Sequence, residues 1–231
     1  KRQTFNNVRT LDELARRVTA NLAVSPEAFL AATDSLLSAK GFKKAEYPAA
    51  FLCDTYEVYA TTSAEKLVRR LVKARDTFWN PDRIAKAREL GLDPVGVTTL
   101  ASIVAEETSK ADERPKVARL YLNRLSRGMK LQADPTVKFA IGDFSLRRIG
   151  GSMLNIDSPY NTYRVKGLPP GPIRIVDPQL IDDVLNAPAH NYIYMCARED
   201  FSGYHNFSTD YATHQANARR YQAELDRRKI H

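Results

Sequence analysis

An acidic residue on the apolar face of a helix is the first sign of chemistry in this sequence. In the segment LASIVAEE, a helical period of about 100° per residue places Leu100, Ile103 and Val104 on one stripe. Glu107 continues this stripe, whereas Glu106 points well away from it. Burial raises the pKa of a carboxyl group, and an acid that keeps its proton near neutral pH suits general acid catalysis. The pattern therefore makes Glu107 a candidate catalytic residue.

A structural interpretation of Glu107 stays open at this level. Many glutamates at the edge of an amphipathic helix reach water or pair with a basic neighbour such as Lys110 or Arg114. Two turn-rich segments downstream favour catalysis, because polar and aromatic side chains around one acid are typical of a pocket. The candidate substrate-binding residues in these segments are Gln132, Asp134, Tyr160, Asn161 and Tyr163.

Asp134 also fits a purely structural role. It precedes Pro135 and Thr136 at the start of a short apolar segment that ends at Gly142. Asp directly before Pro is a favoured helix start, at which the carboxylate accepts hydrogen bonds from free N–H groups. We therefore favour N-capping over direct chemistry for Asp134.

The length and composition are those of an ordinary globular protein. The 231 residues are 43% hydrophobic and 27% charged, which fits one large domain or two small ones. No run approaches the roughly 18 apolar residues that a membrane-spanning helix needs. The chain opens abruptly with KRQTFNNVRT, and we interpret it as a fragment whose natural N-terminus, with an anchor or signal segment, has been removed.

The charge balance is basic but does not select a partner. Thirty-five Lys and Arg against 27 Asp and Glu give a net charge of +8, which suits contact with nucleic acid, anionic lipid or a cell-wall polymer. The basic residues are spread over several predicted helices, and no nucleic-acid-binding signature is present. We therefore expect mainly solvated helix faces and no nucleic-acid partner.

The cysteines and histidines do not form a recognisable metal site. Cys53 and Cys196 lie far apart and form no CxxC pair, although a single disulfide in an oxidising compartment stays open. His205 and His214 lack the spacing of metal ligands, so we interpret both as structural histidines. We expect neither a metal nor another cofactor.

Apolar spacing and helix-start residues predict a mostly helical α+β fold. The predicted helices cover residues 10–22, 26–41, 63–79, 80–94, 94–107, 115–128, 135–142, 177–188 and 209–228. Extended segments within 47–62 and a hairpin within 191–207 supply the β structure.

Two further features concern organisation. The turn-rich residues 143–175 predict a long loop of the kind that lines a substrate cleft. Asp93-Pro94-Val95-Gly96 is the best boundary candidate in the chain. It predicts an N-terminal region, residues 1–95, followed by a catalytic domain, residues 96–231.

Several segments, in this order, resemble the endolytic murein transglycosylases of the MltG/YceG-like family. The motifs that carry the resemblance are IVAEET, ERPKVARLYLNRL, GMKLQADPTVKFAIG, SPYNTYRVKGLPPGPI and GYHNFS, with FLCDTYEVYATTSAEKL upstream. They cover nearly all of residues 10–221. In an EKET pattern the family's catalytic glutamate precedes Thr, and that position is Glu107 here. Ala105 replaces the first acid of the pattern, and Glu106 occupies its middle position.

The resemblance implies a lysozyme-like active-site helix and a small β-hairpin in the catalytic domain, preceded by the end of a LysM-like subdomain. It also implies that the five candidate residues named above line the cleft. The implied location is the periplasmic side of the bacterial inner membrane, through an N-terminal anchor absent from this chain. The implied substrate is the glycan strand of peptidoglycan, with peptidoglycan synthases and division proteins as candidate partners.

The residues and the resemblance together lead to a predicted reaction. A glycosidase that uses water generally needs two carboxylates, and Asp134 is a doubtful second one. A lytic transglycosylase uses the sugar's own hydroxyl instead. We therefore predict cleavage of the bond from N-acetylmuramic acid (MurNAc) to N-acetylglucosamine (GlcNAc), giving 1,6-anhydroMurNAc ends, with Glu107 as acid and then base. The alternatives are a muramidase-type hydrolase that uses Asp134, and a noncatalytic module that binds glycan or polyanion.

Overall fold

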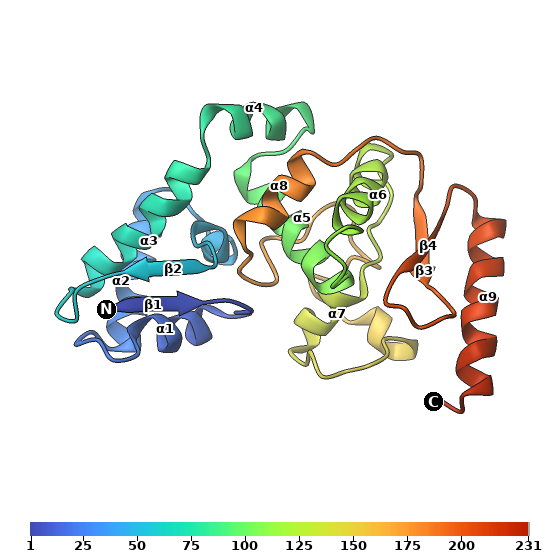
Figure 1. Cartoon of the computed structure of the whole chain (residues 1–231), viewed down its shortest axis with the longest axis horizontal. Helices are drawn as coiled ribbons and strands as arrows, with labels where there is room; N and C mark the ends of the chain where they lie inside the picture. Colours follow the sequence, from blue (N-terminus) through green and yellow to red (C-terminus); the bar gives the residue numbers. More distant parts are fainter. Residues whose placement is uncertain (231) are drawn as a thin grey trace.

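The computed structural model describes residues 1–230 and shows a mostly helical α+β protein with two small antiparallel sheets. Its buried apolar residues form two clusters that lie side by side along the longest axis (Figure 1). The first cluster is built mainly from residues before 73, and the second mainly from residues after 78.

The N-terminal cluster combines helices with a two-stranded sheet. Its elements are β1 (Arg2–Phe5), α1 (Leu11–Thr19), α2 (Pro26–Ala39), the 3-10 helix η1 (Lys44–Ala50), β2 (Asp54–Glu57) and α3 (Ala64–Phe78). The side chains of Thr10, Ser25 and Ser63 cap α1, α2 and α3, at the helix starts that the sequence predicted. The sequence did not predict β1, which pairs with β2.

The segment 47–62 is only partly extended. Its first residues belong to η1, which starts where the Lys43 N–H donates to the Glu46 carboxylate at 2.8 Å. This local hydrogen bond closes a helical turn, so the expectation of extended backbone there was wrong. The extended part is β2, in which Tyr56 is buried and stacks on Phe5 of β1.

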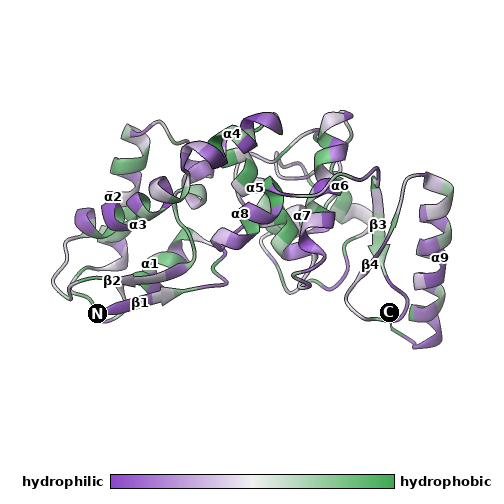
Figure 2. Ribbon diagram, turned by 45° about the horizontal axis from the view of Figure 1, so that its top comes forward, coloured by the Kyte–Doolittle hydropathy of each residue, from purple (hydrophilic) through white to green (hydrophobic). Residues whose placement is uncertain are grey.

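The second cluster surrounds one helix, α5 (Pro94–Glu107). The other elements are α4 (Pro81–Glu89), α6 (Arg114–Ser126), α7 (Asp134–Ile141), the 3-10 helix η2 (Gly151–Asn155), α8 (Pro178–Leu185), β3 (Tyr194–Ala197), β4 (His205–Ser208) and α9 (Tyr211–Arg227). Apolar residues colour the middle of α5, whereas α9 is largely hydrophilic (Figure 2). All residues of α5 from Val97 to Val104 are buried, so this helix is the centre of the core.

Polar side chains in α5 and at its start have hydrogen-bond partners, some of them local and one distant in the sequence. Asp93 caps the helix by accepting from the Gly96 N–H at 2.7 Å. The Thr98 hydroxyl donates to the Pro94 carbonyl, and the Ser102 hydroxyl accepts from the Ile173 N–H at 3.0 Å. Because these groups have partners, the helix can be buried on all sides without stranding polar atoms.

Residues 173–176 connect the two clusters. Ile175 belongs to the N-terminal cluster and Ile173 and Val176 to the second. The Ile175 N–H donates to the Val8 carbonyl, and the Cys53 N–H to the Val176 carbonyl, both at 2.9 Å. A segment late in the sequence thus crosses back to the N-terminal part. The division at residues 95 and 96 stays a prediction, and it coincides with the first turn of α5.

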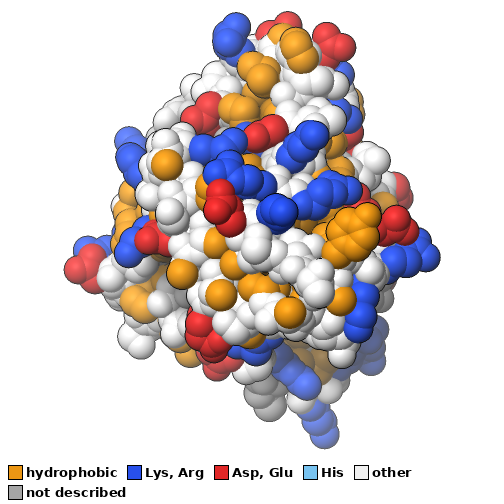
Figure 3. Space-filling view, turned by 90° about the vertical axis from the view of Figure 1, so that its left-hand side faces the viewer, with side chains coloured by type: hydrophobic (Ala, Val, Ile, Leu, Met, Phe, Trp, Pro, Cys, Tyr) orange, Lys and Arg blue, Asp and Glu red, His pale blue; other side chains and the backbone are white. Residues whose placement is uncertain are grey.

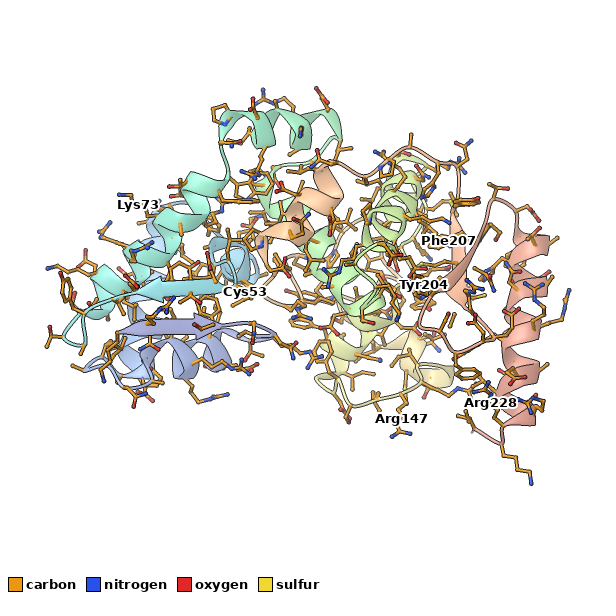
Figure 4. All side chains as sticks on the ribbon, viewed as in Figure 1. Cys53, Lys73, Arg147, Tyr204, Phe207 and Arg228 are labelled. Carbon is orange, nitrogen blue, oxygen red and sulfur yellow. The ribbon has the colours of Figure 1, made fainter. Side chains whose placement is uncertain are left out.

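The predicted hairpin is confirmed. β3 pairs antiparallel with β4, with Met195 opposite Phe207, and α9 packs against both strands. Tyr204 and Phe207 lie on the side of the hairpin that faces α6 (Figure 4). There the Lys116 Nζ atom of α6 lies 4.3 Å from the centre of the Phe207 ring, so a cation–π contact joins the helix to the hairpin.

The cysteines are not paired. Cys53 is buried in the N-terminal cluster near β2 (Figure 4), and Cys196 is half-buried in β3. Both are free thiols, so the open disulfide alternative is resolved against pairing.

The surface has mixed charge. On the face at the N-terminal end of the long axis, Lys and Arg side chains gather in the upper half, with acidic side chains among them (Figure 3). Over residues 1–230, no helix has both the length and the apolar character to cross a bilayer.

Candidate active site

Glu107 is the last residue of α5 and opens into a pocket of about 600 Å³. Leu100, Ile103 and Val104, which share its stripe, are fully buried. Thr108 leaves the helix in an extended conformation, with φ −144° and ψ 135°. The structure therefore confirms the predicted apolar stripe, and Glu107 at its end faces the pocket.

Pocket residues come from three parts of the chain. The helical core and the segment before α7 contribute Glu107, Leu120, Tyr121, Arg124, Leu131, Gln132 and Asp134. The long loop contributes Arg147, Arg148, Ile149 and Tyr163. The C-terminal part of the chain, from the hairpin onward, contributes Met195, Cys196, Ala197, Phe201, His205, Tyr221, Gln222, Leu225 and Ile230. The long loop therefore lines the pocket in part, as its turn-rich sequence indicated.

Its surroundings hold Glu107 protonated close to neutral pH. Burial, and after it repulsion from the Asp134 carboxylate, raise the pKa of Glu107 to about 7. A hydrogen bond from Tyr121 and the charge of Lys138 act in the opposite direction, and Glu106 adds a small rise. An acid with a pKa near 7 can both give and take a proton at physiological pH.

Tyr121, on α6, is the hydrogen-bonding partner of Glu107 that sequence reasoning missed. Its side chain is buried, and burial together with the nearby Glu107 charge raises its pKa well above the ordinary range. The phenol therefore keeps its proton and acts as a donor. Its position on the apolar stripe of α6 with Val117 made it look like a core residue.

Asp134 does not cap α7. The N-cap residue is Ala133, and Asp134 is the first residue of the helix. Its carboxylate instead accepts a hydrogen bond from the Tyr163 hydroxyl at 2.5 Å. The favoured N-capping role was therefore wrong, because the preceding chain turns Asp134 toward the pocket. Burial and Asp134 raise the pKa of Tyr163, so this phenol also remains a donor.

Gln132 has a backbone conformation that is rare for its residue type. Its φ is +52°, in the left-handed region that non-glycine residues seldom occupy. Two hydrogen bonds hold the segment there, from the Gln132 N–H to the Thr162 carbonyl at 3.1 Å and from the Ala133 N–H to the Thr162 hydroxyl at 2.9 Å. The result places the exposed Gln132 side chain at the pocket.

Asn161 and Tyr160 are placed behind the pocket lining. Asn161 is fully buried, and its amide N–H groups donate to the carbonyls of Leu154 and Ile156, both at 2.9 Å. Its side-chain oxygen accepts from the Tyr163 N–H at 3.0 Å. Tyr160 packs on Phe139. The structure thus brings Gln132, Asp134 and Tyr163 together with Glu107, and it uses Asn161 to support Tyr163.

Glu106 faces away from the pocket. Its carboxylate forms ion pairs with Arg174 at 3.0 Å and with Arg9 at 3.3 Å, and its side chain is 12% exposed. The Arg9 guanidinium also lies 4.5 Å from the centre of the Phe144 ring. Glu106 therefore links α5 to the N-terminal residues and to the long loop.

Arg124 is a second pocket residue that sequence reasoning missed. It is buried, and its guanidinium donates to the Ile193 carbonyl at 2.7 Å and to the Lys130 carbonyl at 2.8 Å. Burial lowers its pKa, yet the group remains a cation at neutral pH. Arg124 lies seven residues after Val117 on α6, so the helical-wheel argument used for Glu107 could have found it.

The two histidines have protein partners. The Nδ1 atom of His205 lies 2.8 Å from the buried Glu113 carboxylate, and His214 stacks on Tyr194. No group of three or more His, Cys, Asp or Glu side chains within residues 1–230 could hold a metal ion.

Fold and pocket together define a class: mostly helical α+β proteins in which an acid at the end of a buried helix opens into a cleft. The model of the YceG-like family matches residues 1–220, and the chain belongs to that family. The resemblance inferred from the motifs is thereby confirmed.

Named relatives support this assignment. The endolytic murein transglycosylase of Bacillus subtilis strain 168 is 32% identical over 139 residues, which are 60% of this chain and 38% of that protein. The endolytic murein transglycosylase of Streptococcus pneumoniae strain D39 is 31% identical over 148 residues, which are 62% of this chain and 26% of that protein. This chain thus spans well under half the length of these curated relatives.

A solved structure shares the fold. The crystal structure of a protein described as yceG-like, from Listeria monocytogenes, aligns with a TM-score of 0.78 at 27% sequence identity. The alignment covers 93% of this chain and 75% of that one. Both the N-terminal part and the pocket part are therefore included in the shared architecture.

Proposed function

We propose that this chain carries the catalytic part of an endolytic peptidoglycan lytic transglycosylase, in which Glu107 acts first as the acid and then as the base. The observation that carries the proposal is the position of Glu107 at the end of a buried helix, in a pocket that it shares with Asp134. Burial and the Asp134 charge raise the pKa of Glu107 to about 7. The names of the relatives supply the substrate class, which is murein. In this reading α5 serves as a lysozyme-like active-site helix.

The proposed reaction needs one proton donor and no water. Protonated Glu107 gives its hydrogen to the oxygen between MurNAc and GlcNAc, and the bond from that oxygen to C1 of MurNAc breaks with its electron pair left on the oxygen. Positive charge develops at C1. The Glu107 carboxylate then takes the proton from the MurNAc 6-hydroxyl, whose oxygen bonds to C1 and closes the 1,6-anhydro ring. The glutamic acid is regenerated, and the two products together have the mass of the substrate.

Neighbouring groups have roles that follow from their contacts. The Asp134 carboxylate stabilises positive charge developing at C1 and raises the proton affinity of Glu107. The hydrogen bond from Tyr163 keeps Asp134 in place. Gln132 offers an amide to the sugar hydroxyls, whereas Asn161 and Tyr160 act indirectly by supporting the backbone and ring next to them. Because these side chains are already positioned before the substrate binds, they need to move little when the reaction occurs.

The cellular setting is part of the same proposal. We place the reaction at the periplasmic face of the bacterial inner membrane, with residues before the catalytic domain forming the end of a LysM-like subdomain. Peptidoglycan synthases and division proteins are the candidate partners. The basic net charge of +8 suits an anionic cell-wall polymer.

The test is the chemistry of the new chain ends. Purified peptidoglycan strands are digested with the wild type and with Glu107→Gln, and the products are analysed by mass spectrometry. Transglycosylation gives 1,6-anhydroMurNAc ends, which are lighter by one water than the reducing ends that hydrolysis leaves. Reducing ends from the wild type would support a muramidase that uses Asp134 instead. Binding of strands without new ends would support a noncatalytic module.

A further inference from the structure

A second buried acid, Glu113, lies next to the pocket and has no part in the reaction described above. It precedes α6 and is 5% exposed. Three donors surround its carboxylate: the Thr108 hydroxyl at 2.9 Å, the His205 N–H at 2.7 Å and the His205 Nδ1 atom at 2.8 Å. A carboxylate accepts several hydrogen bonds, so all three donors are satisfied by one side chain.

One partner of Glu113 controls the end of the catalytic helix. Thr108 follows Glu107 directly and is the residue at which α5 ends. Besides donating to Glu113, the Thr108 hydroxyl accepts from the Lys110 N–H at 3.1 Å. Two hydrogen bonds therefore hold the residue immediately after Glu107 in place.

The other partner belongs to a different wall of the pocket. His205 is the first residue of β4 and lines the pocket. Its backbone and its Nδ1 atom are both engaged by Glu113, which fixes the plane of the imidazole ring. Its Nε2 atom is involved in no hydrogen bond within residues 1–230 and is left available to a ligand.

We propose that Glu113 is a positioning residue that acts on both walls: through Thr108 it holds Glu107, and through His205 it presents the imidazole Nε2 atom to a sugar of the bound glycan. The role of His205 rests on the proposed function. The role of Thr108 concerns the surroundings of Glu107 and can be measured without any substrate. The paired walls explain why one buried carboxylate contacts residues 108 and 205, which are distant in sequence.

Small displacements at Thr108 would change what surrounds Glu107. The ionisable groups that act on Glu107 are Asp134 and Lys138 from α7, Tyr121 from α6 and Glu106 from α5 itself, with Tyr163 bound to Asp134 from the long loop. Moving Glu107 away from Asp134 and toward water removes both main causes of its high pKa. The same movement takes the proton donor out of line with the glycosidic oxygen.

Thr108→Val and Thr108→Ser form a matched pair for the test. Valine keeps the shape of threonine and removes the hydroxyl, whereas serine keeps the hydroxyl. We expect Thr108→Val to lose roughly ten- to a hundredfold in kcat with KM changed by less than about threefold, since misplacement of a reacting group acts on the chemical step. Thr108→Ser should restore most of the turnover.

The decisive measurement is the pKa of Glu107 itself. Proteins labelled with ¹³C at the glutamate carboxyl are titrated by NMR, and the Glu107 signal is assigned by its loss in Glu107→Gln. Thr108→Val should move the pKa from about 7 toward the ordinary 4.5, and Thr108→Ser should leave it near 7. A merely structural role would lower the melting temperature and leave this pKa in place. An unchanged pKa in Thr108→Val therefore overturns the proposal, whatever the turnover.

The second arm tests His205. In His205→Asn the amide nitrogen can replace Nδ1 as the donor to Glu113, while the Nε2 atom is lost. We expect a several-fold rise in KM with little change in kcat, and Glu113→Gln should combine a higher KM with a lower kcat. A wild-type KM in His205→Asn overturns the contact with substrate. If the wild type makes no anhydro ends but the Glu107 pKa shifts as stated, the proposed function fails and the role of Thr108 stands.

Discussion

The last turn of α5 carries two adjacent acids with opposite surroundings. Glu106 faces the N-terminal residues and the long loop, where two guanidinium groups pair with it. Glu107 faces the pocket, where its near neighbours are a phenol and another carboxylate. No ion pair joins Glu107 to a basic side chain in the described part of the chain. Adjacent residues of the same type thus meet two different electrostatic environments.

Burial alone does not separate the two acids. The Glu106 side chain is only 12% exposed, yet its cations compensate for the loss of water. Glu107 loses water without that compensation, so its proton is held more tightly. The partners that a helix turn selects decide whether an acid becomes an ionic link or a proton donor.

The largest expected effect comes from removing the donor. Glu107→Gln keeps the shape of the side chain but cannot give a proton, so turnover should fall by at least about a hundredfold. Glu106→Gln is the matched control and should keep kcat within about threefold. The measurement is the initial rate of glycan cleavage at equal concentrations of folded protein. Near-normal cleavage by Glu107→Gln would remove the proton-donor role.

Asp134→Asn should change the pH profile more than the products. Asparagine can still accept from Tyr163, but the repulsion that raises the pKa of Glu107 is gone. In the wild type, kcat/KM should fall as the pH rises through about 7, since the acid form is needed. The variant should show that fall at lower pH and lose severalfold in rate at pH 7. Complete loss of cleavage at every pH would instead support Asp134 as a second catalytic carboxylate.

A smaller effect concerns stability and has the opposite sign from activity. The folded pKa of Glu107, about 7, lies above the ordinary 4.5, so the native state holds this proton more tightly and stability falls as the pH rises between these values. Glu107→Gln removes that loss. We expect the free energy of unfolding of this variant to exceed that of the wild type by roughly 1–3 kcal/mol at pH 8 and to match it near pH 4. Urea unfolding at both pH values measures the difference, and an equal gain at both would exclude this cause.

The smallest effect tests the ionic side of the turn. Arg9→Gln removes the longer and more exposed of the two ion pairs of Glu106, and exposed pairs contribute about 0–1 kcal/mol. We expect the free energy of unfolding, measured by urea unfolding, to fall by about 0–1 kcal/mol, and by less at 1 M salt. The pH profile of cleavage should stay unchanged. A shifted profile would mean that the two acids are coupled more strongly than their contacts indicate.

Local sequence rules predicted much of this molecule. Cap residues such as Thr10, Ser25 and Ser63 mark helix starts because their side chains accept hydrogen bonds from N–H groups three residues later. The position of Glu107 was likewise predictable, because helical spacing places it on one stripe with Leu100, Ile103 and Val104. These features depend on residues close in sequence, which is why the sequence alone could place them.

The rest depends on contacts between distant segments. Asp134 looked like a cap, but Thr162 fixes the chain before α7 by accepting from the Ala133 N–H. The Asp134 carboxylate accepts a hydrogen bond from the Tyr163 hydroxyl instead. Nothing in the sequence indicated that Glu113 is buried against His205, which lies 92 residues later in the chain. Asn161 looked like a substrate ligand, and its amide is committed to backbone carbonyls. No spacing rule within one segment could have supplied these partners.

The hairpin and α9 supply the last wall of the pocket, from residues after 194. During synthesis the chain up to α8 therefore has the glutamate but not its full enclosure. Hydration of that side chain should keep its pKa ordinary until the C-terminal helix has docked against the hairpin. The environment that holds the Glu107 proton is in this sense among the last parts of the molecule to form during folding.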